Sequence, residues 1–401
     1  MPSLVFRKGL DLKAAVAGDL AAAYDSSIVD DIRASGFVRT RGRLTVHLAR
    51  EFGFCYGVDR AVDYAYQTRK RFPDKRVFLT GEIIHNPHVN DQLRVHGIRF
   101  LSDPGEDDSS LGADDVVILP AFGVSVADMA RLDARGCTLV DTTCGSVLTV
   151  WKNVKRYAQD GFTSIIHGKV THEETRATAS QATQYPNGHY LVVLDREEAE
   201  TVCRYIKDGG DREAFLARFA DATSPGFDPD VHLSHVGCAN QTTMLMSESL
   251  EIGRMIGAAM AARYGEEQLA DRFRAFDTIC SATQERQDAV LNLLAEESLD
   301  VMVVIGGYNS SNTCNLAKIC GARVPTFHIA DTGCLVSASE IRHRPIGLPS
   351  TASVLEEIGE NWLPDGPVVV GLTAGASTPN NIVGQVIGRL EALTSSAPTL
   401  S

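Results

Sequence analysis

The sequence lacks the long apolar and basic runs that mark membrane proteins and nucleic-acid-binding proteins. No apolar stretch approaches the roughly 20 residues that a membrane-spanning helix needs. No run of Lys or Arg stands out and the net charge is −13, so we expect no nucleic-acid surface. The N-terminus has no apolar signal-peptide core, and its Asp residues argue against an organellar transit peptide. These absences indicate a cytoplasmic protein that binds neither membrane nor nucleic acid.

Cysteine is present in an odd number, nine, which fits a reducing compartment better than a disulfide framework. Six of the nine share no common sequence context, and we interpret them as small buried hydrophobic residues. These six are Cys137, Cys203, Cys238, Cys314, Cys320 and Cys334. The chain has 401 residues of which 44% are hydrophobic, so it can bury substantial cores, and two or three domains are expected.

From Leu44 onward, short β-branched runs alternate with helical patterns, which predicts an α/β fold with parallel strands. The predicted strands are Arg43–His47, Val77–Leu79, Val116–Leu119, Ser164–Ile166, Tyr190–Leu194, Val301–Ile305, Thr326–His328 and Val368–Leu372. Residues 1–43 show no strand pattern and are expected to form a helical N-terminal extension on the surface, with helices over Leu10–Tyr24 and Ser27–Ser35.

Three segments end a predicted strand with a cysteine and then begin a predicted helix. Their cysteines are Cys55, Cys144 and Cys280. A thiol at a helix N-terminus lies near unpaired N–H groups and the positive end of the helix dipole, which favours the metal-binding thiolate. The three corners are far apart in the chain, so they must converge in space to bind one metal group. Iron–sulfur clusters normally take four protein ligands, so three thiolates would leave one iron without a protein ligand.

The cysteine corners also suggest where the domains begin and end. We predict α/β domains over residues 44–143, 144–276 and 277–395, after the extension 1–43 and before a tail over 396–401. The middle domain contains a polar insertion near residues 208–230.

Polar loops follow several predicted strands, where ligands gather in open α/β sheets. His85 precedes Pro87 at the start of a helix, and spacing alone favours a residue that merely caps the loop. The segment His167–Thr175 places imidazoles and two carboxylates before a helix. One carboxyl group there can be a proton donor if burial raises its pKa, but ordinary first-turn acids are an equally good interpretation.

Two further loops combine glycines with hydroxyl and amide side chains before a helix, as phosphate-binding loops do. They are Gly306–Asn312 and Gly371–Pro379. One such loop is weak evidence, but two in one domain favour an anion site over plain turns. The hydroxyl-rich turn Ala239–Thr243 is most simply a helix cap.

Eight motifs together resemble the 4-hydroxy-3-methylbut-2-enyl diphosphate reductase family, also called IspH or LytB, in the family's order. They are Gly53–Ala61, Glu82–Asn86, Asp141–Cys144, His172–Thr175, Asn240–Thr243, Thr278–Gln287, Asn309–Asn312 and Thr373–Pro379. The resemblance extends from about residue 44 to 393. Each motif alone is unspecific, but their ordered combination is highly specific.

The resemblance implies small, mainly parallel sheets in three α/β domains, arranged as a trefoil around a central [4Fe–4S] cluster. Cys55, Cys144 and Cys280 would hold the cluster, with one iron not ligated by cysteine. It implies that the diphosphate of the allylic substrate is bound by His85, His172, Ser310, Ser311, Asn312 and Ser377. Glu174 matches the family's proton-delivering glutamate, with His172 and Thr242 also near the reacting groups. The implied reaction is reductive dehydroxylation to isopentenyl and dimethylallyl diphosphates, the last step of the methylerythritol phosphate route to isoprenoids.

The chain departs from the short bacterial form of the family, which usually has Ala-His-Gly-Val-Ser where this chain has Ala121–Ser125. Phe122 therefore replaces a diphosphate-facing histidine. The extension and the middle insertion are also absent from the short form, so the chain is similar to the longer cyanobacterial and plant branch. That resemblance implies a one-electron donor protein such as ferredoxin or flavodoxin.

Two alternatives use similar cysteines. A quinolinate synthase-like dehydratase also places three cysteines around one cluster in an α/β trefoil, but the ordered motifs argue against it. A non-enzymatic iron–sulfur sensor needs a partner or nucleic-acid surface, which the sequence does not show, and leaves Glu174 and the phosphate loops unexplained.

Overall fold

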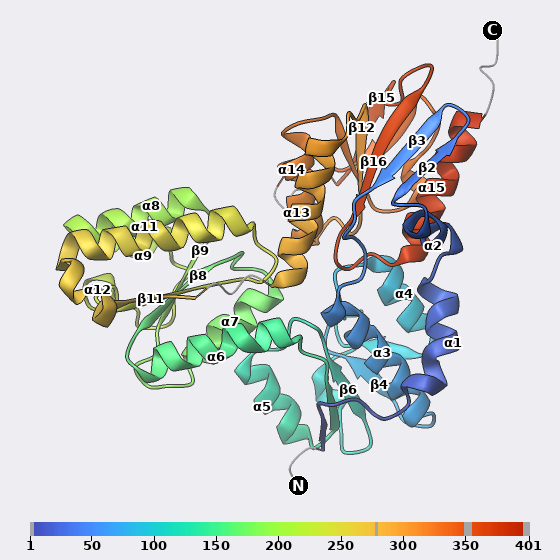
Figure 1. The fold of residues 1–401 in the computed structure, drawn as a ribbon. Coiled ribbons are helices and arrows are strands. Elements are labelled where there is room, and N and C mark those ends of the chain that lie inside the picture. Colours follow the sequence, from blue (N-terminus) through green and yellow to red (C-terminus); the bar gives the residue numbers. More distant parts are fainter. Residues whose placement is uncertain (1–3, 277–279, 349–354, 396–401) are drawn as a thin grey trace. The chain divides into compact units, whose positions relative to one another are not determined.

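The computed structural model describes residues 4–276, 280–348 and 355–395, which form an α/β fold with several small, mainly parallel sheets (Figure 1). Contacts divide the chain into two compact units. The first unit contains the segment up to Arg7 and Pro104–Cys280, and the second contains Lys8–Asp103 and the chain from Ser281 onward. The division into three domains at residues 143 and 276 stays a prediction.

A four-stranded parallel sheet with the order β11-β10-β8-β9 forms the centre of the first unit. The strands are β8 (Thr163–His167), β9 (Tyr190–Val193), β10 (Val236–Asn240) and β11 (Phe273–Ala275). Helices α6 (Gly145–Gln159) and α7 (Glu173–Ala182) lie on one side of the sheet, and α8 (Arg196–Asp208) and α11 (Met246–Tyr264) on the other (Figure 1). Burial of β8 and β10 on both faces follows from this arrangement.

The polar insertion in the first unit is structured. It contains α9 (Arg212–Arg218) and α10 (Pro229–His232), and it places Phe215, Phe219 and Phe227 in the same hydrophobic core as β8 and β9. The remaining elements of this unit are α12 (Glu266–Arg272), α5 (Val126–Arg135), the short 3-10 helix η1 (Asp108–Ser110) and three parallel strands, β1 (Val5–Phe6), β7 (Thr138–Asp141) and β6 (Val116–Leu119).

The second unit is built on a five-stranded sheet with the order β13-β12-β16-β3-β2. Its strands are β2 (Val38–Arg41), β3 (Leu44–Leu48), β12 (Val301–Ile305), β13 (Thr326–Ile329) and β16 (Val368–Ala374), and only β2 runs antiparallel to its neighbour. Helices α13 (Ser281–Glu296) and α14 (Ser311–Gly321) cover one face, and α2 (Ser27–Ala34) and α15 (Asn380–Ser395) cover the other (Figure 1).

Strand β12 shows why this sheet is covered on both faces, because successive side chains point to opposite faces. Met302 and Val304 pack with residues of α13 and α14, whereas Val301, Val303 and Ile305 pack with residues of α15 and α2. A continuous apolar run is therefore the expected sequence for a strand in this position.

The second unit also contains two strand pairs and three further helices. The strands are β4 (Val77–Leu79) with β5 (Ile98–Phe100), which are parallel, and β14 (Glu340–His343) with β15 (Glu357–Glu360), which are antiparallel. The helices are α1 (Lys13–Tyr24), α3 (Tyr56–Arg71) and α4 (Pro87–Val95), with the short 3-10 helix η2 (Thr332–Cys334).

All eight predicted strands are confirmed, with ends that differ by no more than a few residues. The expectation that residues 1–43 contain no strand is wrong, because the segment contains β1 and β2. Helix α2 is mostly exposed and buries only Val29 and Ile32, which pack in the hydrophobic core. Arg39 and Arg41 alternate with Val38 and Thr40, so this edge strand has too few apolar residues for periodicity to reveal it. The predicted strand end at residues 277–279 and the predicted tail lie outside the described residues.

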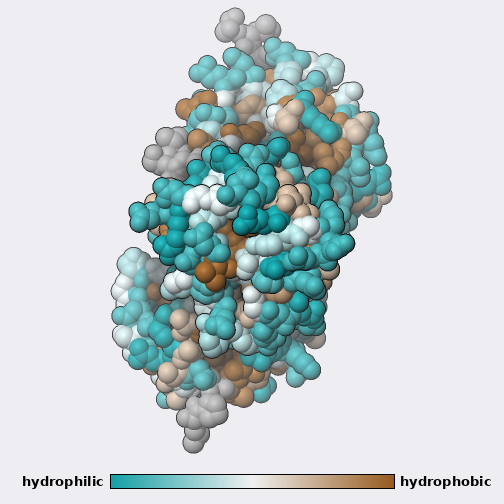
Figure 2. Space-filling model, turned by 90° about the vertical axis from the view of Figure 1, so that its left-hand side faces the viewer, coloured by the Kyte–Doolittle hydropathy of each residue, from teal (hydrophilic) through white to brown (hydrophobic). Residues whose placement is uncertain are grey.

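Among the described residues, no helix combines the length and the apolar composition needed to cross a membrane. The face drawn in Figure 2 is mainly hydrophilic, and its hydrophobic residues form small separate patches.

Candidate functional site

The three predicted cysteine ligands lie where helices begin. Cys55 is the N-cap residue of α3, Cys144 is the N-cap residue of α6, and Cys280 directly precedes α13. All three are half-buried. Backbone bonds fix two of these corners, because Cys55 N donates to Ala376 O at 3.1 Å and Cys144 N donates to Ala121 O at 2.8 Å. The thiols therefore point from fixed turns at the positive ends of helix dipoles, which suits thiolate ligands of a metal group.

Four of the other cysteines have different surroundings. Burial raises the pKa of Cys203 to about 11 and those of Cys238 and Cys320 to about 12, and it also raises the pKa of Cys137. Such thiols remain protonated and are poor ligands, as the interpretation of buried hydrophobic residues predicts. Cys334 is buried as well, but the interpretation is wrong for Cys314, which is only half-buried and donates to Tyr308 O at 3.4 Å.

Four of the predicted phosphate-binding residues of the second unit form a group that we call the cradle, defined by Ser310, Ser311, Asn312 and Ser377. All four are buried. Ser310 caps α14, and Asn312 Oδ1 accepts a hydrogen bond from Ala376 N at 2.9 Å, which joins the two predicted loops. Asn312 Nδ2 is buried and has no hydrogen-bond partner among the described residues. A buried donor without a partner is costly, so this atom indicates a place for an acceptor such as a phosphate oxygen.

His85 lies beside the cradle, since its backbone O accepts a hydrogen bond from Ser377 Oγ at 3.1 Å. Its Nδ1 lies 2.8 Å from Glu82 Oε2, and Asn309 Nδ2 donates to the same carboxylate oxygen at 3.0 Å. The backbone of His85 comes close to Gly307, where a Cβ would lie only 2.5 Å from His85 O, so glycine is needed at this position. Asn86, which follows His85, is the N-cap residue of α4.

Glu174 and Thr242 form a buried pair in the first unit. Glu174 is only 2% exposed, and its two carboxylate oxygens accept hydrogen bonds from Thr242 N at 2.6 Å and Thr242 Oγ1 at 3.0 Å. Glu173, in contrast, is exposed. The helix geometry thus separates the two acids, and a first-turn acid that is this deeply buried is more than an ordinary helix-terminal charge.

His172 begins α7 and accepts a hydrogen bond from Glu174 N at 3.1 Å through its Nδ1. The Phe122 ring contacts the His172 ring edge-on, with 5.9 Å between the ring centroids. Phe122 therefore occupies a position where it supports His172 by packing, although it cannot donate a hydrogen bond to a phosphate.

The prediction of a helix cap at Ala239–Thr243 is wrong. Helix α11 begins later, at Met246, and its N-cap residue is Leu245, with no side-chain capping bond. The turn instead holds Glu174 through Thr242, and Gln241 bonds to the loop that carries His172 and Glu174. The sequence signal for Gln241 was an amide directly after a buried strand, which by itself does not reveal a tertiary partner.

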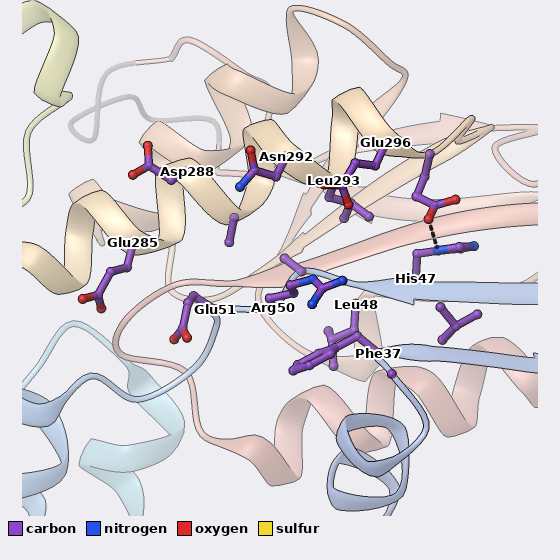
Figure 3. Close-up of a pocket in the computed structure, with 15 residues that line it drawn as sticks. Phe37, His47, Leu48, Arg50, Glu51, Glu285, Asp288, Asn292, Leu293 and Glu296 are labelled. Carbon is purple, nitrogen blue, oxygen red and sulfur yellow. Dashed lines mark ion pairs between the residues drawn. The ribbon is translucent and has the colours of Figure 1, made fainter.

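A separate pocket of about 300 Å³ lies beside β3 in the second unit (Figure 3). Glu285, Asp288 and Glu296 project toward it from α13, and His47 Nδ1 pairs with Glu297 at 3.4 Å. None of the predicted site residues is among the described residues that line this pocket. Its acidic lining disfavours a diphosphate, so we do not include it in the candidate site.

The chain belongs to the LytB protein family, since the sequence model of that family matches residues 46–391. Family membership covers both phosphate loops, the three cysteine corners and the Glu174–Thr242 pair. It favours neither the dehydratase nor the sensor alternative.

Curated relatives carry a more specific name. The chain is 52% identical to a 4-hydroxy-3-methylbut-2-enyl diphosphate reductase of Gloeobacter violaceus, over 96% of this chain and 91% of the relative. It is also 52% identical to the enzyme of the same name from Synechococcus strain CC9311, over 96% of this chain and 95% of the relative. Both relatives are cyanobacterial and extend over nearly the whole chain, which confirms the prediction of the longer branch.

Two solved structures are similar. One is (E)-4-hydroxy-3-methyl-but-2-enyl diphosphate reductase, described as the terminal enzyme of the non-mevalonate pathway, with 26% identity, a TM-score of 0.53 and coverage of 86% of this chain and 99% of that one. The other is the reductase from Plasmodium falciparum, with 20% identity, a TM-score of 0.62 and coverage of 88% of each chain. The second supports the fold alone, and the α/β class predicted from the sequence is confirmed.

Proposed function

We propose that this chain is a 4-hydroxy-3-methylbut-2-enyl diphosphate reductase. It removes the hydroxyl group of the allylic substrate as water and adds two electrons and two protons, which gives isopentenyl diphosphate and dimethylallyl diphosphate. The structural observation that carries the proposal is the buried Glu174, whose carboxylate is held by Thr242 through two hydrogen bonds of 2.6 and 3.0 Å. A buried acid fixed in this way is suited to deliver a proton to one atom of a bound substrate.

We propose a [4Fe–4S] cluster held by Cys55, Cys144 and Cys280, with one iron not ligated by cysteine. Their half-buried positions at three helix starts support this choice, in contrast to the fully buried cysteines with raised pKa values. When bound, such a cluster supplies electrons one at a time.

The residues of this chain divide the remaining work between them. His85, His172 and the cradle residues Ser310, Ser311, Asn312 and Ser377 bind the diphosphate through hydroxyl, amide and imidazole groups. Asn312 Nδ2, which has no described protein partner, donates to a phosphate oxygen. Glu174 delivers the proton, and the Thr242 hydroxyl keeps the carboxyl group aimed at the substrate.

We further propose that a one-electron donor protein such as ferredoxin or flavodoxin reduces the enzyme, and that the reaction takes place in the cytoplasm. The similarity to cyanobacterial relatives supports the donor. The odd number of cysteines, nine, supports a reducing compartment.

Turnover of Glu174→Gln tests the proposed proton donor. The amide keeps the size of the side chain but cannot give up a proton, so turnover should fall by roughly 10²–10⁴-fold, the range of general acid catalysis, while substrate binding is retained. Glu173→Gln is the matched control and should remain near wild type, because Glu173 is exposed. Near-normal turnover of Glu174→Gln, or a larger loss in Glu173→Gln, would show that the donor is a different group.

Iron content and activity of cysteine variants test the cluster ligands. Replacing Cys55, Cys144 or Cys280 with Ser should remove most of the iron and the activity, whereas Cys203→Ser and Cys320→Ser should retain both. A variant of the first three that keeps full iron and activity would remove that residue from the ligand set.

A further inference from the structure

We propose that Gln241 is a positioning residue that fixes the proton-donating carboxyl group of Glu174, an inference that rests on the proposed function. Gln241 has no exposed surface and lies directly after β10, between the strand and Thr242. Its side chain bonds to two segments of the first unit. One is the β8–α7 loop with the first turn of α7, which carries Glu174, and the other is the β10–α11 loop, which carries Thr242.

Three hydrogen bonds define this clamp. Gln241 Oε1 accepts from Thr175 Oγ1 at 3.1 Å and from Lys169 N at 3.2 Å, and Gln241 Nε2 donates to Thr243 Oγ1 at 2.7 Å. Thr175 directly follows Glu174 in α7, so the bond to Thr175 acts next to the carboxyl-bearing residue. Thr243 directly follows Thr242, so the bond to Thr243 acts next to the residue that holds the Glu174 carboxylate.

The packing around the clamp leaves no room for an alternative arrangement. A Cβ on Gly168 would lie 2.7 Å from Thr175 Oγ1 and 3.1 Å from Gln241 Cβ. The backbone also joins the two strands here, since Gln241 N donates to His167 O at 2.8 Å. The amide side chain therefore lies in a tightly packed, buried position, where replacing it removes these three hydrogen bonds together.

The clamp matters for chemistry because Glu174 depends on both loops. Its carboxylate accepts from the backbone and the hydroxyl of Thr242, and these bonds survive only while the two loops keep their separation. A shift of about 1 Å in a reacting group can reduce a rate about 10²-fold. Gln241 and Thr175 thus act on the reaction through Glu174, without contact to substrate.

The test uses the cluster-loaded, full-length protein with two pairs of variants. Gln241→Met and Thr175→Val remove hydrogen-bonding groups with little change in size, whereas Thr175→Ser keeps the hydroxyl group. Gln181→Met is the control, because Gln181 is a similarly buried glutamine of α7 whose Nε2 donates to Ala177 O at 3.2 Å and whose Oε1 accepts from Gln184 Nε2 at 2.6 Å. The readouts are kcat and KM, the pH profile of kcat, and hydrogen exchange of the Thr242 amide.

We expect kcat to fall about 10²-fold in Gln241→Met and Thr175→Val with KM nearly unchanged. The Thr242 amide should exchange roughly 5–10-fold faster in both, because its bond to Glu174 weakens. The pH profile of kcat should shift in both, and Thr175→Ser should restore all three readouts toward wild type. Gln181→Met should lower thermal stability without changing any of them.

Wild-type kcat and wild-type Thr242 exchange in Gln241→Met and Thr175→Val would overturn the positioning role. Equal changes in Gln181→Met would overturn it too, because they would show a general loss of stability. The activity of Glu174→Gln separates these outcomes from a failure of the proposed function. If Glu174→Gln is inactive and Gln241→Met is normal, only the positioning role fails; if Glu174→Gln is active, the assignment of the proton donor fails first.

Discussion

The buried side-chain amide of Asn312 allows a sharp test of the cradle, because only one of its two polar atoms is hydrogen-bonded. Asn312 Oδ1 accepts from Ala376 N at 2.9 Å, while Nδ2 has no hydrogen-bond partner among the described residues. In the ligand-free protein, Asn312→Ala removes a buried donor that has no partner, but it also takes the acceptor away from Ala376 N. Each effect is on the order of 1 kcal/mol, so they largely cancel and thermal stability should change little.

Binding of pyrophosphate should respond quite differently. A hydrogen bond to a charged phosphate oxygen is worth about 1.5–3 kcal/mol, which corresponds to roughly 13–160-fold weaker binding when it is lost. Calorimetric titration of the cluster-loaded enzyme with inorganic pyrophosphate measures this change directly. Asn312→Asp should bind more weakly still, because it keeps the acceptor for Ala376 N but turns a negative charge toward the anion.

Gln67→Leu is the control, because it should lower stability without weakening pyrophosphate binding. Gln67 is buried in the second unit and its Oε1 accepts from Leu10 N and Leu12 N, both at 3.1 Å. Its loss leaves two backbone donors without their partner, so stability should fall while pyrophosphate affinity stays at the wild-type value. If Asn312→Ala retains wild-type affinity, or loses stability as Gln67→Leu does, the reasoning about the unpartnered Nδ2 is refuted.

Two further predictions concern packing and pH. Phe122→Ala removes the edge-on ring contact with His172, so the free energy of unfolding should fall by about 2 kcal/mol, with a smaller effect on pyrophosphate affinity. Unchanged stability with a collapse in affinity would instead give the ring a direct role in binding. Burial lowers the pKa of His328 to about 4 in the folded protein, against about 6.5 in the unfolded chain. The neutral imidazole therefore stabilises the fold at pH 7, and this contribution is lost as the pH falls from about 6.5 towards 4. Denaturant unfolding measures this effect. Between pH 7 and pH 5, the free energy of unfolding should fall by about 2 kcal/mol less in His328→Gln than in wild type, and an equal fall in both proteins would contradict the assignment.

Local patterns predicted the strands and the cysteine corners because those signals lie within a few neighbouring residues. The run Val301–Ile305 is apolar on both faces, and the helices after Cys55 and Cys144 begin at the next residue. Edge strand β2 was missed because Val38 is its only apolar residue. Val29 and Ile32 lie three residues apart in α2, but α15, which packs with them in the same hydrophobic core, is far along the chain.

Parts of the candidate site depended on contacts that only the fold creates. The acid of Glu174 could be named from its position, but its two bonds to Thr242 join residues from different loops. The same holds for Gln241, which was interpreted with its neighbours as a helix cap because the sequence does not show where the helix begins. Here tertiary hydrogen bonding decided the role of residues whose local propensities were neutral.

The position of β16 between β12 and β3 has a consequence for synthesis on the ribosome. Strand β3 is made early, but its parallel partner β16 (Val368–Ala374) emerges only near the end of translation. The β2–β3 hairpin must therefore wait with one edge uncovered while Pro104–Cys280, a continuous stretch, can already complete its own four-stranded sheet. Nascent chains arrested before residue 368 should thus contain a protease-resistant middle segment and an incomplete second sheet. We expect chaperones to bind mainly at the early β2–β3 hairpin, whose edge is still uncovered.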